Sequence, residues 1–293
     1  MNKAKALKKR FATFRLLTGL TVEVFDRLLE ELQPVWQRAR EKQANRRNRQ
    51  RQPGAGHPFS LTLEDMLLAL LMYYRTYTTY AFLGFLFGVD DSTICRIVRR
   101  LEPLLASIFR IPEKKVELSE DEIREAFVDA TERPINRPQK KQKKYYSGKK
   151  KRHTMKAQVI VVRKKKKCED KKNRNEKRRV RIAAVSASTP GTEHDKKLYD
   201  RTRTLIPPDL ECYGDSGYQG TTMKTPVKKP RKGELTACQK RANRELSQKR
   251  IVAEHGIGKM KIWRIAADKY RNLRSRHTVK MKNVAGLHNR MFG

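Results

Sequence analysis

The stretch EAFVDATERPINRPQKKQKKYYSGKKKRHTMKAQVIVV, residues 125–162, joins two short apolar runs through a dense run of cations. AFVDA reads as a short buried strand with Asp129 at its end. Residues 149–164 read as a second strand, because their apolar residues first alternate and then become continuous. A strand holds a carboxylate rigidly. The stretch therefore predicts the start of a β-sheet that presents Asp129 in a strongly basic setting.

The pattern downstream continues as strands and helices. It predicts a third strand at 178–188, a turn and helix at 189–206, a fourth strand entering a glycine-rich turn at 210–220, and a long helix at 235–263. Residues 164–177 read as a charged, hairpin-like loop. We therefore expect an α/β domain over residues 113–293, with a mixed sheet and flanking helices.

The first part of the chain reads as helical. Residues 20–50 begin as an amphipathic helix with Thr21 as its N-cap and then become a polar, arginine-rich run. That run is interpreted as a solvated arm or as an arm that becomes ordered on DNA. The Gly/Pro segment QPGAGHP, residues 52–58, predicts a linker. A basic N-terminal region is thus expected over residues 1–58.

Residues 59–112 are expected to form an all-α domain of three helices. The second helix is short and ends at Gly88, and a third helix restarts directly after it. The candidate N-caps are Ser60 or Thr62 for the first helix and Asp91 or Ser92 for the third. A short helix, a glycine-bearing turn and a second helix are the layout of a helix-turn-helix.

The third of these helices has two distinct faces. Its helical period predicts an apolar face of Ile94, Ile97, Val98, Leu101 and Leu105, and a polar face of Thr93, Arg96, Arg99 and Arg100. The polar face is the candidate DNA-binding surface. An ordinary three-helix bundle with a solvated basic face is the alternative, and the net charge of the chain favours the first reading.

Charge narrows the class of protein further. The chain of 293 residues carries 69 Lys and Arg against 31 Asp and Glu, a net charge of +38. Such self-repulsion calls for a polyanionic partner, and nucleic acid rewards dense cations through counterion release. An anionic membrane surface is the rival partner, but the sequence shows no basic amphipathic helix with a strong apolar face. The longest apolar run, residues 66–74, is too short to span a bilayer.

The four cysteines are scattered without a C-x-x-C pair, which argues against a zinc ribbon or a disulfide framework and fits a reducing compartment. The N-terminus is basic and lacks a signal-peptide pattern, while its lack of acids leaves a transit peptide as a minor alternative. These features predict a soluble intracellular protein that faces nucleic acid.

Three carboxylates are candidates for a metal site. Asp129 and Asp215 follow predicted strands, and Glu254 lies on the long helix. Oxygen ligands of this kind hold Mg²⁺, and paired ions can clamp both oxygens of an in-line phosphodiester displacement. An isolated aspartate after a strand is more often a cap or turn residue. Asp195 reads equally as a helix-start residue, and Glu132 is a competitor for the metal.

Several segments resemble a known family. VDATERPINRP, YYSGKKKRHTMKAQ, GTEHDKKLYD, YGDSGYQG and RIVAEHGIGKMKIWRI are similar to the DDE transposases of bacterial insertion sequences, in particular the IS5-type group. The segment from LTLEDMLLALLMYY to TICRIVRRL resembles the helix-turn-helix that precedes their catalytic domain. The resemblance extends from about residue 15 to residue 292, with the motifs in the order of the family.

This resemblance implies a ribonuclease-H-like catalytic core. It assigns Asp129, Asp215 and Glu254 as catalytic and metal-binding residues, with two Mg²⁺ ions that Mn²⁺ can replace. It also implies the reaction: one strand is hydrolysed at each element end, and the 3′-OH then attacks target DNA without a covalent protein intermediate. In the helical signature of the wider group, Arg250, Glu254 and Lys261 match, while Ser247 stands where that group has Tyr.

The partners expected from this resemblance are double-stranded DNA, at the element ends and the target, and a second copy of the chain. Two ends must be brought together, so a homodimer or a larger assembly is expected, in the bacterial cytoplasm at the nucleoid, with no membrane and no small-molecule substrate. Between Arg137 and Arg181 there are 22 Lys and Arg against three acids, which predicts a DNA track that includes Lys150, Lys151 and Arg152.

Two other functions remain open at this point. The first is a DNA-binding protein derived from such an element that has lost its chemistry. The second is a basic RNA-binding protein. This hypothesis explains the charge, but it does not explain the acids at the ends of predicted strands, and the sequence contains no RNP-type aromatic motif. His153 reads as a phosphate-contacting or surface residue, and Tyr145 and Tyr146 read as a half-buried strand entry or a stacking platform.

Overall fold

The structure is a computed structural model that describes residues 3–45, 58–114, 123–164, 180–202, 207, 210–230 and 233–292. The chain divides into two compact units. One comprises Met1–Arg110 with Ile262–Ile265, and the other comprises Ile111–Lys261 with Ala266–Gly293. Almost all of the predicted linker at 52–58 and of the predicted charged loop at 164–177 lies outside the described residues.

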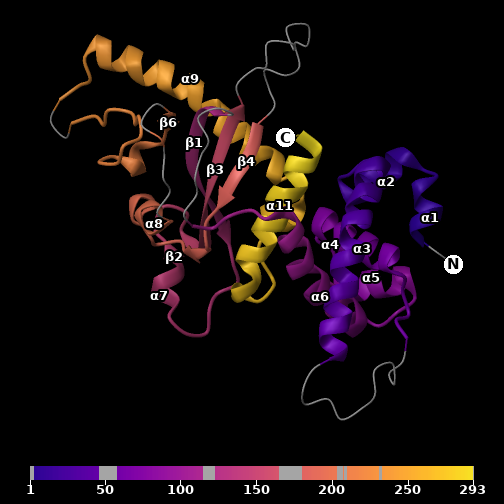
Figure 1. The fold of residues 1–293 in the computed structure, drawn as a ribbon. Helices are drawn as coiled ribbons and strands as arrows, with labels where there is room; N and C mark the ends of the chain where they lie inside the picture. Colours follow the sequence, from indigo (N-terminus) through magenta and orange to yellow (C-terminus); the bar gives the residue numbers. More distant parts are fainter. Residues whose placement is uncertain are drawn as a thin grey trace, which may run out of the picture. The chain divides into compact units, whose positions relative to one another are not determined.

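The first unit is all-helical (Figure 1). Its helices are α1 (Lys3–Lys8), α2 (Phe11–Thr18), α3 (Val22–Ala44), α4 (Leu63–Thr76), α5 (Tyr80–Phe87) and α6 (Asp91–Phe109). The sequence did not suggest α1 and α2. Thr21 and Thr62 are N-caps as predicted, and their hydroxyls accept hydrogen bonds from the backbone N–H groups of Val24 and Asp65.

The turn between α5 and α6 requires two glycines. Gly88 has a φ of 69°, in the left-handed region, and ends α5 as predicted. A Cβ on Gly84 would lie 2.5 Å from the carbonyl oxygen of Val89, so only glycine allows the turn to close this tightly. The predicted cap of α6 was wrong: Asp90 is its N-cap, without a side-chain hydrogen bond. The five predicted apolar residues of α6 are all buried.

The second unit contains a mixed sheet. Its strands are β1 (Ile123–Pro134), β2 (Tyr146–Ser147), β3 (Arg152–Lys164), β4 (Val180–Val185), β5 (Thr189–Pro190) and β6 (Glu211–Tyr213). β3 pairs antiparallel with β1 and β4, and β6 lies parallel to β1 on its other side. Three antiparallel strands followed by one parallel to the first confirm the predicted mixed α/β fold.

Helices complete this unit. They are α7 (Gln142–Tyr145), α8 (Asp195–Thr202), α9 (Ala237–Met260), α10 (Arg264–Ala267, of which the last two residues belong here) and α11 (His277–Phe292). α11 packs beside β4 (Figure 1) and was not anticipated from the sequence. Within the described residues, no helix combines the length and apolar character needed to cross a bilayer.

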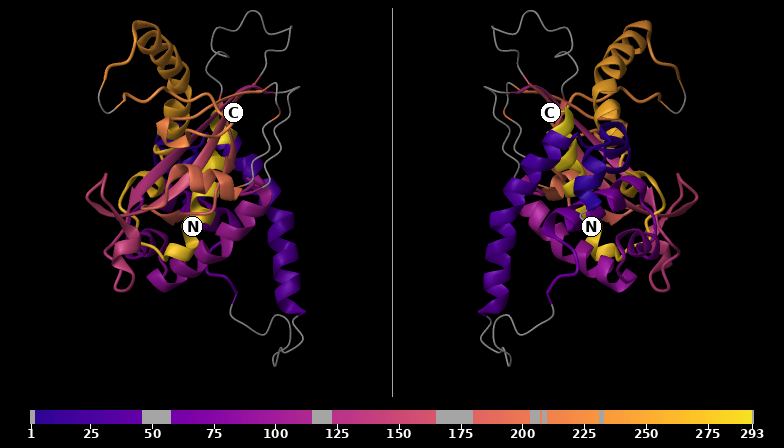
Figure 2. Two further views of the ribbon diagram at one scale, coloured as in Figure 1. Left: turned by 90° about the vertical axis from the view of Figure 1, so that its left-hand side faces the viewer. Right: turned by 90° about the vertical axis from the view of Figure 1, so that its right-hand side faces the viewer.

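The two ends of the long helix α9 lie in different environments. It begins with a capping box between Thr236 and Gln239. Its last part packs on the sheet, where a Cβ on Gly256 would lie 3.0 Å from Val161. Its first part is mostly exposed and projects beyond the sheet (Figure 2). A helix anchored at one end can therefore carry side chains from solvent to the sheet edge.

The position of Asp129 corrects the sequence analysis. The acid was expected at a strand end, yet β1 continues for five residues to Pro134. The apolar run stops at Asp129, but pairing with β3 does not: Glu132 lies opposite Lys156 and Pro134 opposite Thr154. Continued backbone pairing lengthens the strand where hydrophobicity no longer marks it.

Candidate active site

β1 and β6 bring Asp129 and Asp215 to the same level of the sheet. The last pair between these parallel strands joins Phe127 to Tyr213. Each aspartate lies two residues beyond that pair, in the same chain direction. Where two parallel strands separate, side chains at their carboxyl ends face a common opening. The two acids predicted from the sequence are therefore neighbours.

The backbone fixes the orientation of both carboxylates. Asp129 Oδ1 accepts a hydrogen bond of 2.8 Å from the N–H of Ala130. Asp215 is the N-cap of a short 3₁₀ turn, η3 (Ser216–Tyr218), and its Oδ1 accepts a 2.8 Å hydrogen bond from the N–H of Gly217. These contacts leave the second oxygen of each carboxylate available for a ligand.

The acids influence one another electrostatically. Burial raises the pKa of Asp129, and the negative charges of Asp215 and Asp195 raise it further, while the Ala130 N–H and the cation of Arg250 act in the opposite direction. The ionised carboxylate is thus held where its charge is disfavoured. Such a position is a frequent sign of a functional site, because a cation bound there relieves the repulsion.

Asp195 is closer to this pair than the sequence indicated. It starts α8, as one reading predicted. A Cβ placed on Gly217 would lie 3.0 Å from Asp215 Oδ1 and 3.1 Å from Asp195 Oδ2, so these two oxygens are within about 6 Å of each other. Glycine at 217 leaves the space between the two acids open.

The charge of Asp195 already has a counterion. Lys156 Nζ lies 2.9 Å from Asp195 Oδ1, while its aligned hydrogen bond goes to the carbonyl oxygen of Glu193. Asp195 Oδ1 is buried and has no aligned hydrogen bond within the described part of the chain. The contact is therefore a charge pair, which offsets the negative charge of Asp195.

Glu254 is the predicted acid that the structure does not bring into this group. It lies on α9 with an exposed side chain, one helical turn after Arg250. Residues four apart share a helix face, and Arg250 is close enough to Asp129 to act on its pKa. Glu254 thus lies on the face of α9 that reaches the acids. Within the described residues, no three His, Cys, Asp or Glu side chains form a ready metal-binding group.

Glu132, the predicted competitor, is engaged elsewhere. Its Oε1 accepts a hydrogen bond from the hydroxyl of Thr154 on β3. A Cβ on Gly191 would lie 2.8 Å from the same Oε1, so this carboxylate is closely enclosed.

The residue that the sequence analysis missed is Tyr218, at the end of η3. The side chain is fully buried, and its hydroxyl has no hydrogen-bond partner among the described residues. Burial raises the pKa of this phenol well above its usual range, and Asp195, Asp129 and Asp215 raise it further. A strand followed by D-x-G-Y was the only available signal, and an aromatic residue there reads as core.

The polar face of α6 is only partly free. Arg96 is exposed and folds along the helix, where it donates hydrogen bonds to the carbonyl and hydroxyl of Ser92. Thr93 is half-buried, and Arg99 is exposed. Arg100 lies over the ring of Phe59, 4.8 Å from its centroid, and burial lowers the pKa of its guanidinium. Arg100 is therefore held by an aromatic contact within this unit, which its spacing did not predict.

Of the remaining predicted cations, all but Arg250 are exposed to solvent. Lys150, Lys151 and Arg152 are exposed on the turn that leads into β3. Arg250 is half-buried, and Lys261 is exposed at the C-cap of α9, just past the helix on which it was expected.

Comparisons with known proteins identify the family of both parts of the chain. Residues 59–111 match the family described as the helix-turn-helix of DDE superfamily endonuclease. Residues 128–174 and 177–289 match the family described as DDE superfamily endonuclease. The chain is 32% identical over 298 residues to a probable transposase for insertion sequence element IS702 of Microchaete diplosiphon, covering 99% of this chain and 97% of the relative. No solved structure matches significantly.

Proposed function

The chain belongs to the DDE superfamily endonucleases and is an insertion-sequence transposase. From this premise we propose that it uses a divalent metal ion to cleave the element ends and to join them to target DNA. The observation that carries the proposal is the placement of Asp129 and Asp215 side by side where β6 separates from β1. The substrate is double-stranded DNA, and the products are a free 3′-OH at each end and then a strand joined to the target.

The residues present fit a divalent metal. All candidate donors are carboxylate oxygens, the set that Mg²⁺ prefers, with Mn²⁺ as a substitute. The raised pKa of Asp129, to which burial and the negative charges of Asp215 and Asp195 contribute, is what a cation would relieve. We propose that Asp129 and Asp215 hold two ions and that Glu254 completes the site. Bound there, Mg²⁺ would neutralise the charge that develops on the scissile phosphate.

The other side chains would hold the DNA. Arg250 and Lys261 would bind phosphates that flank the scissile bond. Arg250 is half-buried near the acids, and Lys261 lies at the C-terminal end of the same helix, α9. Thr93, Arg96 and Arg99 on α6 would enter the major groove at the element end. Lys150, Lys151 and Arg152 would follow the backbone.

The working assembly is proposed to contain at least two chains. Two element ends must be held for one joining event, and a symmetric pair of chains would supply one copy of Asp129, Asp215 and Glu254 for each end. It would act in the cytoplasm, at the nucleoid. A mass measurement on complexes with end DNA is expected to give two or more chains, and a single chain that protects both ends would contradict this.

A catalytically silent DNA-binding protein is the alternative, favoured by one observation: Glu254 is exposed, and no three potential ligand side chains in the described part of the chain form a metal-binding group. The two functions differ in their need for metal. We expect duplex DNA that carries the sequences flanking the gene to be nicked at a defined position in Mg²⁺ or Mn²⁺, with joined products on longer incubation. Excess chelator is expected to abolish both, because no carboxylate can replace the cation.

A gel that resolves nicks and joined strands measures this outcome. Duplex DNA of scrambled sequence is the control for end recognition. Tight binding to the flanking sequence, without any metal-dependent cut, would reject the enzyme and leave the silent binding protein.

A further inference from the structure

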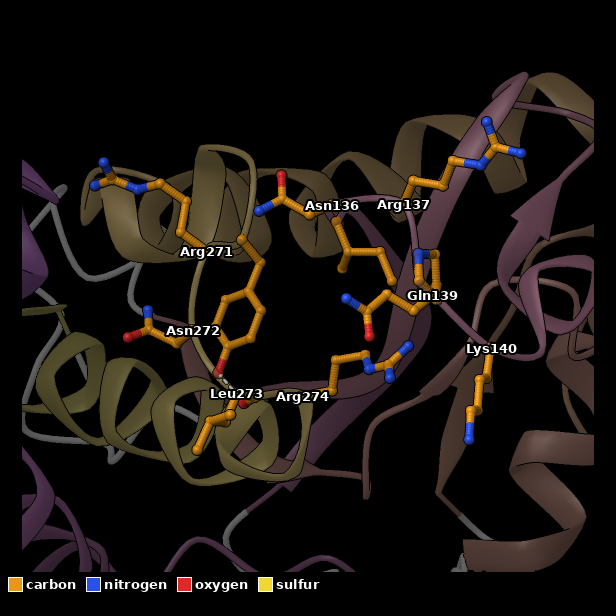
Figure 3. Close-up of a pocket in the computed structure, with 11 residues that line it drawn as sticks. Asn136, Arg137, Gln139, Lys140, Arg271, Asn272, Leu273 and Arg274 are labelled. Atoms are coloured by element: carbon orange, nitrogen blue, oxygen red, sulfur yellow. Dashed lines mark hydrogen bonds between the residues drawn. The ribbon is translucent and has the colours of Figure 1, made fainter.

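A hollow of about 390 Å³ lies away from the acids, between two segments of the second unit (Figure 3). One wall is the chain that leaves β1, residues 135–140, and the other is residues 270–274. In Figure 3, Gln139 and Arg274 turn toward the middle of the hollow, whereas Arg137 and Arg271 point outward from its two ends. The segment 270–274 was not singled out by its sequence.

The two walls are fastened together. Ile135 and Tyr270 form a parallel β-bridge, and the Tyr270 N–H donates a 2.8 Å hydrogen bond to the carbonyl of Pro134. The Tyr270 hydroxyl donates to the carbonyl of Leu273 at 2.9 Å. Arg133 lies over the Tyr270 ring, 5.0 Å from its centroid. The hollow is therefore a built feature with a buried floor, and its shape does not depend on one loop alone.

The lining is strongly positive. Arg137, Lys140, Arg271 and Arg274 contribute cations, and Asn136, Gln139 and Asn272 contribute carboxamides. No carboxylate belongs to the described lining. A cluster of cations along one small hollow favours an anionic ligand there.

Two of these cations are held in place by neighbours. The Arg274 guanidinium lies over the Tyr145 ring, 4.7 Å from its centroid. Arg137 Nε donates a 2.9 Å hydrogen bond to Gln142 Oε1. A guanidinium oriented by an aromatic ring keeps its remaining N–H donors directed outward, which suits the bidentate recognition of a phosphate.

We propose that this hollow binds the phosphodiester backbone of one DNA strand, as a grip separate from the cleavage site. This rests on the proposed function. From Asp129 to Ile135 along β1 the distance is roughly 20 Å. In duplex DNA the phosphates of one strand advance about 3.4 Å per base pair along the helix axis. On a duplex aligned with β1, the hollow would therefore contact the strand about six base pairs from the scissile bond, and the same cations could hold a single-stranded end.

The test compares the full-length protein with the double variant Arg137→Gln and Arg274→Gln. Arg124→Gln, an exposed arginine at the opposite end of β1, is the matched control. Affinity is measured against salt concentration for a plain duplex and for the same duplex with a single-stranded overhang. We expect the double variant to bind about tenfold more weakly and to lower the salt slope by about two, whereas the control keeps its slope.

The two substrates identify the source of the phosphates. A loss on both substrates assigns the hollow to duplex DNA, and a loss confined to the overhang assigns it to a single strand. An unchanged salt slope on both, with wild-type cleavage of element ends, would reject the grip and leave the proposed function intact. If the wild-type protein neither binds nor cuts end DNA, the proposed function itself fails.

A second inference rests on the Tyr218 hydroxyl, whose pKa burial and the charges of the nearby acids raise. This hydroxyl is buried and has no hydrogen-bond partner among the described residues, while Asp195 Oδ1 is paired by charge with Lys156 Nζ at 2.9 Å. The Tyr218 ring is fixed edge-on against Tyr199, with centroids 6.2 Å apart. Leaving a buried hydroxyl unpaired is costly, so this donor calls for an acceptor.

We infer that Tyr218 is a positioning residue whose hydroxyl donates a hydrogen bond to the Asp195 carboxylate when the site is loaded. Loading would draw the carboxylate away from Lys156, and the phenol would then fix its orientation. A side chain that orients an acidic group near a metal typically changes metal affinity by about tenfold to a hundredfold.

Tyr218→Phe tests this directly, because it removes only the hydroxyl. Without metal, we expect the Tm of the variant to be unchanged or raised. The Mg²⁺ concentration that gives half of the Mg²⁺-induced rise in Tm should be about tenfold higher than for the wild type. Cleavage should shift to higher Mg²⁺ in parallel. Tyr199→Phe is the control, and its Mg²⁺ dependence should match the wild type. A Tyr218→Phe protein with the wild-type Mg²⁺ dependence in both measurements would overturn the inference.

Discussion

Asp129→Asn is expected to lower single-turnover strand cleavage by about a hundredfold or more and, at the same time, to raise the Tm of the metal-free protein. Burial and the charges of Asp215 and Asp195 raise the pKa of this carboxyl. The folded protein therefore binds this proton more tightly than the unfolded chain. Ionised Asp129 accordingly destabilises the fold. This destabilisation is fully present at pH values above the raised pKa of the folded state and disappears below the ordinary pKa of the unfolded chain. Near pH 7 the uncharged amide in the Asp129→Asn variant removes it.

The effect of Mg²⁺ on Tm distinguishes the loss of a metal ligand from a general stabilisation of the fold by the Asp129→Asn change. Mg²⁺ should raise the Tm of the wild type and leave that of Asp129→Asn nearly unchanged, because the cation and the amide relieve the same repulsion. Asp200→Asn is the matched control, since Asp200 is exposed on α8 near Asp195. Its cleavage and its Mg²⁺ response should equal those of the wild type. An Asp129→Asn protein that still cuts at the wild-type rate would refute the role given to this residue.

Glu254→Gln is expected to abolish cleavage to a similar degree without raising the Tm. The side chain is exposed, so its charge costs the fold little. Its role would appear only when metal and DNA draw it from the face of α9 toward the aspartates. Gel assays of cleavage and binding should show lost cutting with retained affinity for end DNA.

Asp195→Asn discriminates between the two candidates for the third acid. Lys156 already offsets the charge of Asp195, and we therefore expect a smaller loss of cleavage, about tenfold. If Asp195→Asn abolished cleavage and Glu254→Gln retained it, Asp195 would be the third acid and the assignment of Glu254 would be wrong.

The fold was largely predictable where local signals and burial agreed. Thr21 and Thr62 cap their helices, and the period of α6 identified its buried face. α11 escaped prediction because it packs on β4 and buries polar side chains, including His277 and Lys280, so its pattern lacks a clear apolar stripe. Tertiary packing, and not amphipathicity, defines this helix.

The candidate site was predictable in part, for a similar reason. Asp129 and Asp215 follow apolar runs, and parallel pairing then makes them neighbours. The proximity of Asp195 depends on Gly217, which leaves space between two segments 20 residues apart. No local pattern records such a contact. The same holds for the contact between Arg100 and the distant Phe59.

The central claim is that Asp129, Asp215 and Glu254 surround the metal, and Fe²⁺ in place of Mg²⁺ tests it most directly. Fe²⁺ with ascorbate and peroxide releases hydroxyl radicals that cut the backbone beside a bound ion, and mass spectrometry locates the cuts. We predict cuts near residues 129 and 215 and, once end DNA is bound, near residue 254, all suppressed by excess Mg²⁺ and absent in Asp129→Asn. Cuts confined to other segments, or unaffected by Asp129→Asn, would contradict the account.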